Sequence, residues 1–131
     1  DALMLPGGFG AAKNLCDLAV RGPACEVHPE VARLIREVHD AGKPVAAICI
    51  APAVLAKVLG ETHPELTIGN DADTAGALES MGATHMECPV REFVVDRERK
   101  IITSPAYMLA QSISEAADGI EGTVTALLEM A

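Results

Sequence analysis

The chain has 131 residues, enough for one domain with a single core, and it carries a formal net charge of −9. The chain has no basic stripe to neutralise phosphates, so we do not expect it to bind nucleic acid or an anionic membrane surface. Half of the residues are apolar, but the chain holds only one Tyr, two Phe and no Trp. We expect an acidic cytoplasmic protein whose aliphatic core lies between a sheet and the helices that cover both of its faces.

The first half of the chain alternates apolar runs with segments of helical spacing. Residues 2–5 predict a buried strand that ends at a glycine turn, and residues 11–20 predict a helix. Residues 29–41 predict a second helix with one apolar stripe, opened by a proline in its first turn. Residues 44–49 predict another buried strand, and apolar residues at helical spacing from Val54 onwards place a helix directly after it.

The second half continues the alternation. Residues 66–68 predict a third short strand, and residues 72–81 predict a helix. Residues 93–103 hold two apolar runs on either side of a polar turn, which predicts a hairpin. The last two helices are expected over residues 107–117 and 123–130.

This order of elements predicts an α/β fold with a mostly parallel sheet, in one domain over residues 1–131. A strand follows Asp1 almost at once, so we expect that N-terminal strands of the sheet are lacking from this chain. Open parallel sheets place their sites beyond the carboxyl ends of the strands. Three segments are expected there, namely Gly7 with Gly8, Cys49 with Ile50, and Gly69 with Asn70.

Cys49 stands where the second strand runs into a helix with almost no loop between them. A residue at such a junction occupies a sharp turn and points over the edge of the sheet. Its sulfur also lies near a helix N-terminus, which favours the reactive thiolate anion. The alternative is that Cys49 is a small buried apolar residue, as most free cysteines are.

The four cysteines, Cys16, Cys25, Cys49 and Cys88, show no spacing typical of zinc ligands. We expect free thiols, no metal and no cofactor.

Pro-Gly-Gly-Phe-Gly at residues 6–10 and Cys-Ile-Ala-Pro-Ala at residues 49–53 are the most distinctive motifs. Together with shorter segments in the same order, they resemble the ElbB family of the PfpI and class I glutamine amidotransferase-like superfamily. The supporting segments are residues 6–15, 41–44, 49–53, 66–69, 73–75, 81–83, 88–90, 94–96 and 103–111.

The resemblance implies a flavodoxin-like three-layer sandwich with Cys49 as the nucleophile at the elbow. It also implies that the backbone N–H groups of Gly8 and Ile50 form an oxyanion hole. Family members are assigned a glyoxalase III-like lyase activity, which converts methylglyoxal or glyoxal to hydroxy acids without a cofactor. The expected substrate is therefore a small aldehyde.

The substrate pocket is expected to include Gly7, Asn14, Asn70 and Tyr107. Asn14 follows the glycine loop, and a plain helix position is its alternative. Tyr107 either closes the pocket or covers a face of the last helix. Asn70 stands where much of the superfamily has a histidine, and an amide cannot act as a base at neutral pH.

Three features depart from the superfamily's pattern. Its acid/base glutamate lies on a strand–helix unit that would precede Asp1. The His-Pro-Glu triplets at residues 28–30 and 63–65 lie before the nucleophile or at the opposite edge of the sheet, so neither is expected to be catalytic. Residues 104–107 replace the late triplet of glutamine amidotransferases, so glutaminase activity is not expected.

Two other functions stay open beside the enzyme. Cys49 could be a redox sensor that is oxidised to sulfinate, or the chain could be a scaffold or pseudoenzyme of isoprenoid metabolism. Turnover of methylglyoxal would support the enzyme, and oxidation of Cys49 without turnover would support the sensor. An unreactive Cys49 would support the scaffold or pseudoenzyme. A homodimer is expected, since proteins of this kind often pair through helices.

Overall fold

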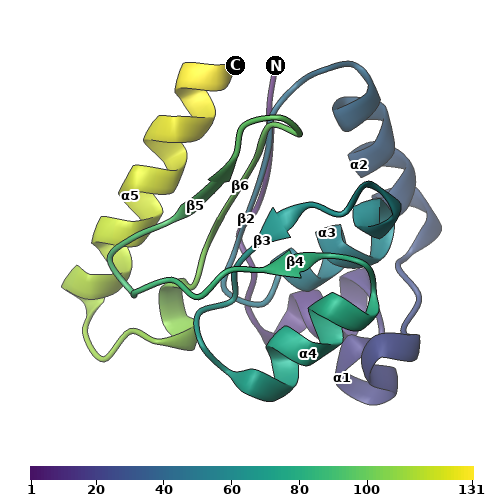
Figure 1. Ribbon diagram of the computed structural model, residues 1–131, viewed down its shortest axis with the longest axis horizontal. Helices are drawn as coiled ribbons and strands as arrows, with labels where there is room; N and C mark the ends of the chain where they lie inside the picture. The colour runs from purple at the N-terminus through teal and green to yellow at the C-terminus, as the bar shows by residue number, and fades with distance from the viewer.

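The computed structural model describes residues 1–131 and has a central four-stranded sheet (Figure 1). Its strands are β1 (Leu3–Leu5), β2 (Val45–Ile48), β5 (Val94–Asp96) and β6 (Ile101–Ser104), in the order β1-β2-β6-β5. The first three strands in this order are parallel, and β5 pairs with β6 as an antiparallel hairpin. The predicted α/β class, mostly parallel sheet and hairpin are confirmed.

β2 lies in the middle because its sequence carries no polar side chain on either face. All four of its residues are buried, and Val45 lies opposite Leu3 on one side and Ile101 on the other. A parallel strand that is covered on both faces reads as a continuous apolar run. The carboxyl ends of β1, β2 and β6 therefore meet at one edge of the sheet.

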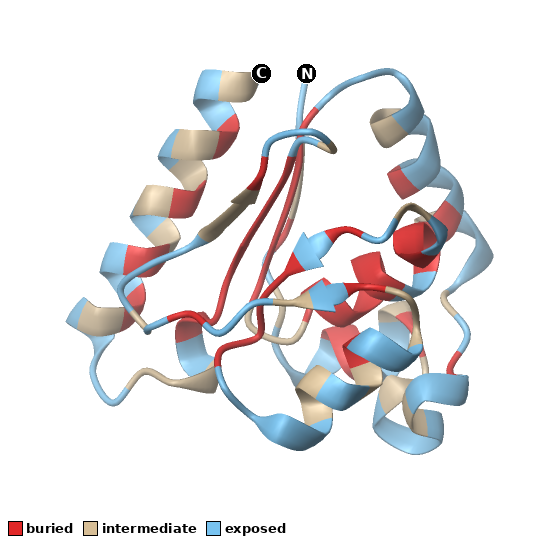
Figure 2. Ribbon diagram, in the orientation of Figure 1, coloured by how far each residue is buried: buried red, intermediate tan, exposed pale blue.

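Helices cover both faces of this sheet, which confirms the flavodoxin-like sandwich (Figures 1 and 2). α2 (Pro29–Asp40) and α3 (Pro52–Leu59) pack on one face and contribute Ile35 and Leu55 to the larger core cluster. α5 (Ile113–Met130) packs on the other face, where its Leu127 meets Ala46 and Ile102. None of the helices combines the length and hydropathy needed to cross a membrane.

The helix predicted over residues 11–20 is interrupted. A π-helical turn, η1 (Ala11–Leu15), is followed by the short helix α1 (Leu18–Arg21) and a 3₁₀ turn, η2 (Gly22–Ala24). Between them, Cys16 is extended and forms an isolated antiparallel bridge with Val27. This long-range pairing overrides the helical spacing, so the prediction of one continuous helix is wrong.

The end of the chain holds one long helix instead of two. A 3₁₀ turn, η4 (Ala106–Met108), precedes α5, whose side-chain cap is Ser112. Two glycines of α5 lie in the gap between the two predicted helices, and they allow close packing. A Cβ atom at Gly119 would lie 2.6 Å from the Val90 carbonyl oxygen, and one at Gly122 would lie 2.5 Å from the Phe93 ring.

The third predicted strand does not belong to the main sheet. β3 (Glu65–Leu66) pairs in parallel with β4 (Thr84–His85), which the sequence did not predict, and α4 (Ala72–Ser80) connects the two strands. Beside β3, side chains of the hairpin strands accept backbone N–H groups that would otherwise bond to a neighbouring strand. The Thr67 N–H donates to Thr103 Oγ1 at 3.0 Å, and the Glu65 N–H donates to Asp96 Oδ2 at 2.9 Å.

Gly119→Ala and Gly76→Ala form a matched pair of helix substitutions. Gly119→Ala forces α5 away from the hairpin, so we expect the free energy of unfolding to fall by about 1–3 kcal/mol. Gly76 lies in α4 with no atom within 4 Å of its Cβ position, so Gly76→Ala should instead add about 0.5–1 kcal/mol. Urea unfolding measures both, and equal effects would contradict the packing of α5.

Candidate active site

The turn between β2 and α3 places Cys49 in a left-handed backbone conformation, with a φ of 63°. Such angles are uncommon for residues other than glycine and persist where the surroundings hold them. The Cys49 N–H donates to the Ser104 carbonyl at 2.9 Å, and the Ala51 N–H donates to the Ile48 carbonyl at 3.1 Å. The cysteine is half-buried, at the sharp elbow that the sequence predicts.

The glycine loop after β1 packs directly against this elbow. Gly7 and Gly8 have φ angles of 87° and 84°. A Cβ atom at Gly7 would lie 2.5 Å from the Ile48 carbonyl oxygen and 2.9 Å from the Cys49 Cβ. Position 7 therefore needs glycine both for its backbone angle and for the close approach of the two turns.

Backbone amides of these turns have no acceptor within the chain, among them those of Gly8 and Ile50. The N–H of Ile50 follows Cys49 directly, and the N–H of Gly8 follows the glycine that contacts Cys49; neither donates a hydrogen bond. Both belong to the turns that meet at the thiol. Donors that are fixed beforehand beside a reacting atom can stabilise negative charge that develops there.

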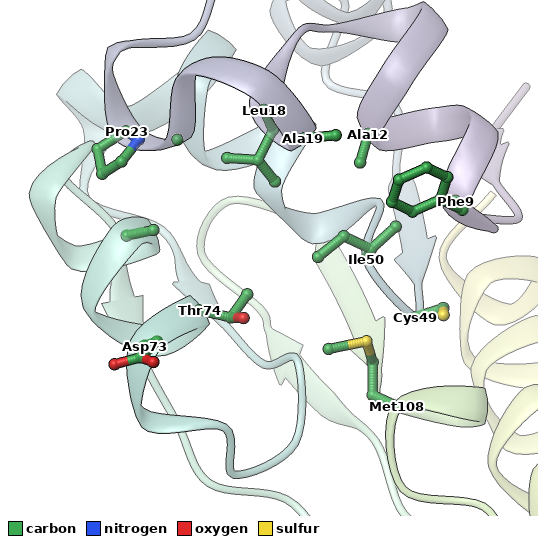
Figure 3. A pocket seen from close by; sticks show the side chains of 12 residues that line it. Phe9, Ala12, Leu18, Ala19, Pro23, Cys49, Ile50, Asp73, Thr74 and Met108 are labelled. Atoms are coloured by element: carbon green, nitrogen blue, oxygen red, sulfur yellow. The ribbon is translucent and has the colours of Figure 1, made fainter.

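A cavity of about 530 Å³ opens beside Cys49. Figure 3 shows Cys49 at one end of the cavity, with Asp73 and Pro23 toward the other end and Ile50 and Leu18 between them. The residues lining the cavity are Phe9, Ala12, Leu18, Ala19, Gly22, Pro23, Cys49, Ile50, Asp73, Thr74, Ala77 and Met108.

The other residues expected in the pocket have different positions. Gly7 contacts the elbow but, like Gly8, does not line the cavity. Asn14 is exposed at a separate shallow cleft, and Asn70 lines another cleft beside Cys88. The Tyr107 side chain is 66% exposed. The role of these residues in substrate binding stays a prediction.

Sequence reasoning missed most of the cavity lining. Leu18 and Pro23 reach the cavity only because the chain folds back between Cys16 and Val27. Met108 reaches it from the turn after β6. One signal was available, since Phe9 follows the glycine turn directly and is one of only two Phe in the chain.

No histidine lines the cavity. His28 caps α2 by accepting the Glu30 N–H at 3.2 Å, and His63 Nδ1 lies 2.8 Å from the Gly82 carbonyl oxygen. His85 accepts the Ile68 N–H at 3.3 Å, and burial lowers its pKa. His39 lies in the last turn of α2. The histidines of both His-Pro-Glu triplets thus contact backbone groups away from the cavity, and Asp73 is the only carboxylate in the lining.

The remaining cysteines are buried, unlike Cys49. Burial raises the pKa of the Cys25 thiol, and the neighbouring Cys16 adds to this effect. Burial, with the nearby Glu92 carboxylate, raises the pKa of Cys88 to about 11. No group of three or more His, Cys, Asp or Glu side chains is arranged to hold a metal ion.

Comparisons with known proteins give one consistent result. The pattern of the DJ-1/PfpI family matches residues 1–115. The human "Glutamine amidotransferase-like class 1 domain-containing protein 3, mitochondrial" is 42% identical in an alignment 139 residues long, which covers 99% of this chain and 51% of the human protein. The rat "ES1 protein homolog, mitochondrial" is 41% identical over 99% of this chain and 52% of its own length. The chain thus spans about half the length of these two relatives.

A solved structure shares the fold over nearly the whole chain. It is described as an isoprenoid biosynthesis protein with an amidotransferase-like domain from Ehrlichia chaffeensis. The two structures superpose with a TM-score of 0.87 at 32% sequence identity, over 99% of this chain and 59% of the other.

Alkylation should select Cys49 among the four cysteines. At neutral pH we expect iodoacetamide to modify Cys49 first, because the other thiols are buried and those of Cys25 and Cys88 have raised pKa values. Peptide mapping by mass spectrometry identifies the site, and Cys49→Ser should remove the fast phase. Comparable early labelling of Cys88 would argue against this site.

Gly7→Ala and Gly8→Ala separate steric contact from backbone strain. Both glycines have positive φ, but a Cβ atom at Gly8 meets no atom within 4 Å. We expect Gly8→Ala to destabilise the fold by about 1 kcal/mol through strain. Gly7→Ala should cost about 1–3 kcal/mol more, because it also forces the elbow to move. Chemical unfolding with Cys49 alkylation measures both effects, and equal losses would rule out the close contact.

Proposed function

The chain belongs to the DJ-1/PfpI family, and from that premise we propose that it is an ElbB-type enzyme that uses Cys49 to attack small α-oxoaldehydes. One observation carries the proposal. The half-buried Cys49 thiol lies at a left-handed elbow, beside an open cavity and next to two amides that have no acceptor. A nucleophile with anion-stabilising donors nearby suits addition to a carbonyl carbon.

The proposed reaction begins when the Cys49 thiolate bonds to the aldehyde carbon of methylglyoxal. The carbonyl π electrons move to oxygen, and the N–H groups of Gly8 and Ile50 stabilise the oxyanion. Protonation gives a hemithioacetal. The carbon-bound proton of the hemithioacetal then moves to the neighbouring keto carbon, and its hydroxyl proton moves to the keto oxygen, which produces a thioester of the 2-hydroxy acid. Water cleaves the thioester, releases lactate and restores the thiol, so no external oxidant or reductant is consumed.

The proton transfer between the two carbons needs a base. Within residues 1–131, the carboxylate that lines the cavity is Asp73, at the end away from Cys49 (Figure 3). We therefore assign the nucleophile and the oxyanion donors to this chain, and the proton transfer to a group outside this lining. A homodimer and a cytoplasmic location remain part of the proposal, while the human and rat relatives carry the word mitochondrial in their names.

A redox sensor is the second candidate function. The exposed part of Cys49 is open to peroxide, and the same two amides could hold the oxygens of a sulfinate. Stoichiometric addition of two oxygen atoms to Cys49, with no turnover of aldehyde, would favour the sensor over the enzyme.

The enzyme proposal predicts lactate production from methylglyoxal. We expect Cys49→Ser to lower the rate by at least about a hundredfold, because the alcohol is a poor nucleophile without an adjacent base. Cys88→Ala, at a buried thiol outside the cavity, should leave the rate close to that of the parent. An enzymatic lactate assay measures all three proteins. Equal turnover by the parent and Cys49→Ser would exclude Cys49 as the nucleophile.

A further inference from the structure

The cavity beside Cys49 is larger than a three-carbon aldehyde requires. Its volume is about 530 Å³. Methylglyoxal has about five heavy atoms, and at roughly 30 Å³ for each water-sized group it would fill ~150 Å³. The volume of the cavity instead lies within the range of sites that hold whole metabolites or drug-sized ligands.

The cavity wall between its two ends is almost entirely apolar. Phe9 and Leu18 come from the segment after β1, while Ile50 comes from the elbow and Met108 from η4. Alanines and a proline fill most of the remaining wall. The polar side chains other than Cys49 are Asp73 and Thr74, both in the first turn of α4. Figure 3 places both away from the Cys49 end.

The polar groups of the lining at the Cys49 end are the thiol and the backbone amide of Ile50, which has no acceptor, and they suit a carbonyl group. A ligand that reaches the rest of the cavity must pass along Ile50 and Leu18, which offer only hydrocarbon contacts (Figure 3). The arrangement is therefore amphiphilic. It has a polar reacting end, a long apolar wall and a small polar group at the far end.

We propose that the preferred substrate of Cys49 is an α-oxoaldehyde with an unbranched or branched hydrocarbon tail of roughly six to ten carbons, a size suited to pockets of this volume. The carbonyl head lies at Cys49, and the tail lies along Ile50 and Leu18 toward α4. This inference rests on the proposed function for the carbonyl chemistry, but the tail site itself depends only on the cavity. Methylglyoxal is then a poor substrate that uses the reacting end alone.

Labelling of Cys49 by maleimides with N-alkyl groups from methyl to octyl tests the tail site without turnover. Each buried CH₂ group should raise the second-order rate roughly threefold to fourfold until the cavity is full. The same reagents react with glutathione as the reference, so that the intrinsic reactivity of each maleimide is divided out. Labelling must be confined to Cys49 by peptide mapping, and Cys49→Ser shows the background.

Ala77→Phe and Ala72→Phe are the matched variants. Ala77 lines the cavity from α4, whereas Ala72 begins the same helix, is exposed and lies outside the lining. Ala77→Phe should fill the tail site and flatten the dependence of the rate on chain length. Ala72→Phe should retain the dependence of the parent. Circular dichroism and urea unfolding establish that both variants fold.

The outcomes separate this inference from the proposed function. A steep dependence on chain length that Ala77→Phe removes supports the tail site, even if no oxoaldehyde of any length is turned over. Rates that stay flat from methyl to octyl, or that fall, overturn the tail site, even if methylglyoxal is converted to lactate. A steep dependence in both alanine variants also overturns it, because the tail would then bind elsewhere.

Discussion

The site depends on the contact between the glycine loop after β1 and the elbow after β2. Cys49 has a left-handed backbone that costs of order 1–3 kcal/mol, so neighbouring structure must hold it in place. The Ser104 carbonyl accepts its N–H from the end of β6, and Gly7 packs against it from the end of β1. Three parallel strands thus fix one residue, and the same arrangement leaves the amides of Gly8 and Ile50 without acceptors.

The opposite wall of the cavity depends on a different long-range contact. The bridge between Cys16 and Val27 turns the chain back on itself, so that residues 17–24 form a short cap of helical turns over the elbow. Cys16 and Cys25 are buried at the two ends of this cap, where they act as apolar packing groups. Because Cys16 and Cys25 are buried, reagents reach them less readily than the half-buried Cys49.

The sequence predicted those features that follow from local pattern. Local pattern alone indicates three such features: the continuous apolar run of β2, the apolar stripe of α2 and the start of α3 soon after Cys49. Features decided by tertiary contacts were not predictable. Gly119 and Gly122 lie between the two helices that the sequence predicts, and only their contacts with the segment before β5 show that they permit close packing. β3 lies outside the main sheet, where the side chain of Asp96 accepts the Glu65 N–H and the side chain of Thr103 accepts the N–H of Thr67, the residue after the strand. The sequence also placed Cys49 at the junction of a strand and a helix, because that position follows from local pattern. It did not place Leu18 and Met108 beside Cys49, because their positions depend on tertiary contacts.

A reactive Cys49 requires that the fold activate its thiol rather than merely expose it. The most direct measurement is the rate of Cys49 alkylation by iodoacetamide at neutral pH, in the folded protein and in the same protein unfolded in urea. Glutathione in the same two solutions corrects for the solvent, and peptide mapping isolates the signal of Cys49. We expect the folded protein to react faster, although its thiol is half-buried. An equal or slower rate in the folded protein would contradict this expectation.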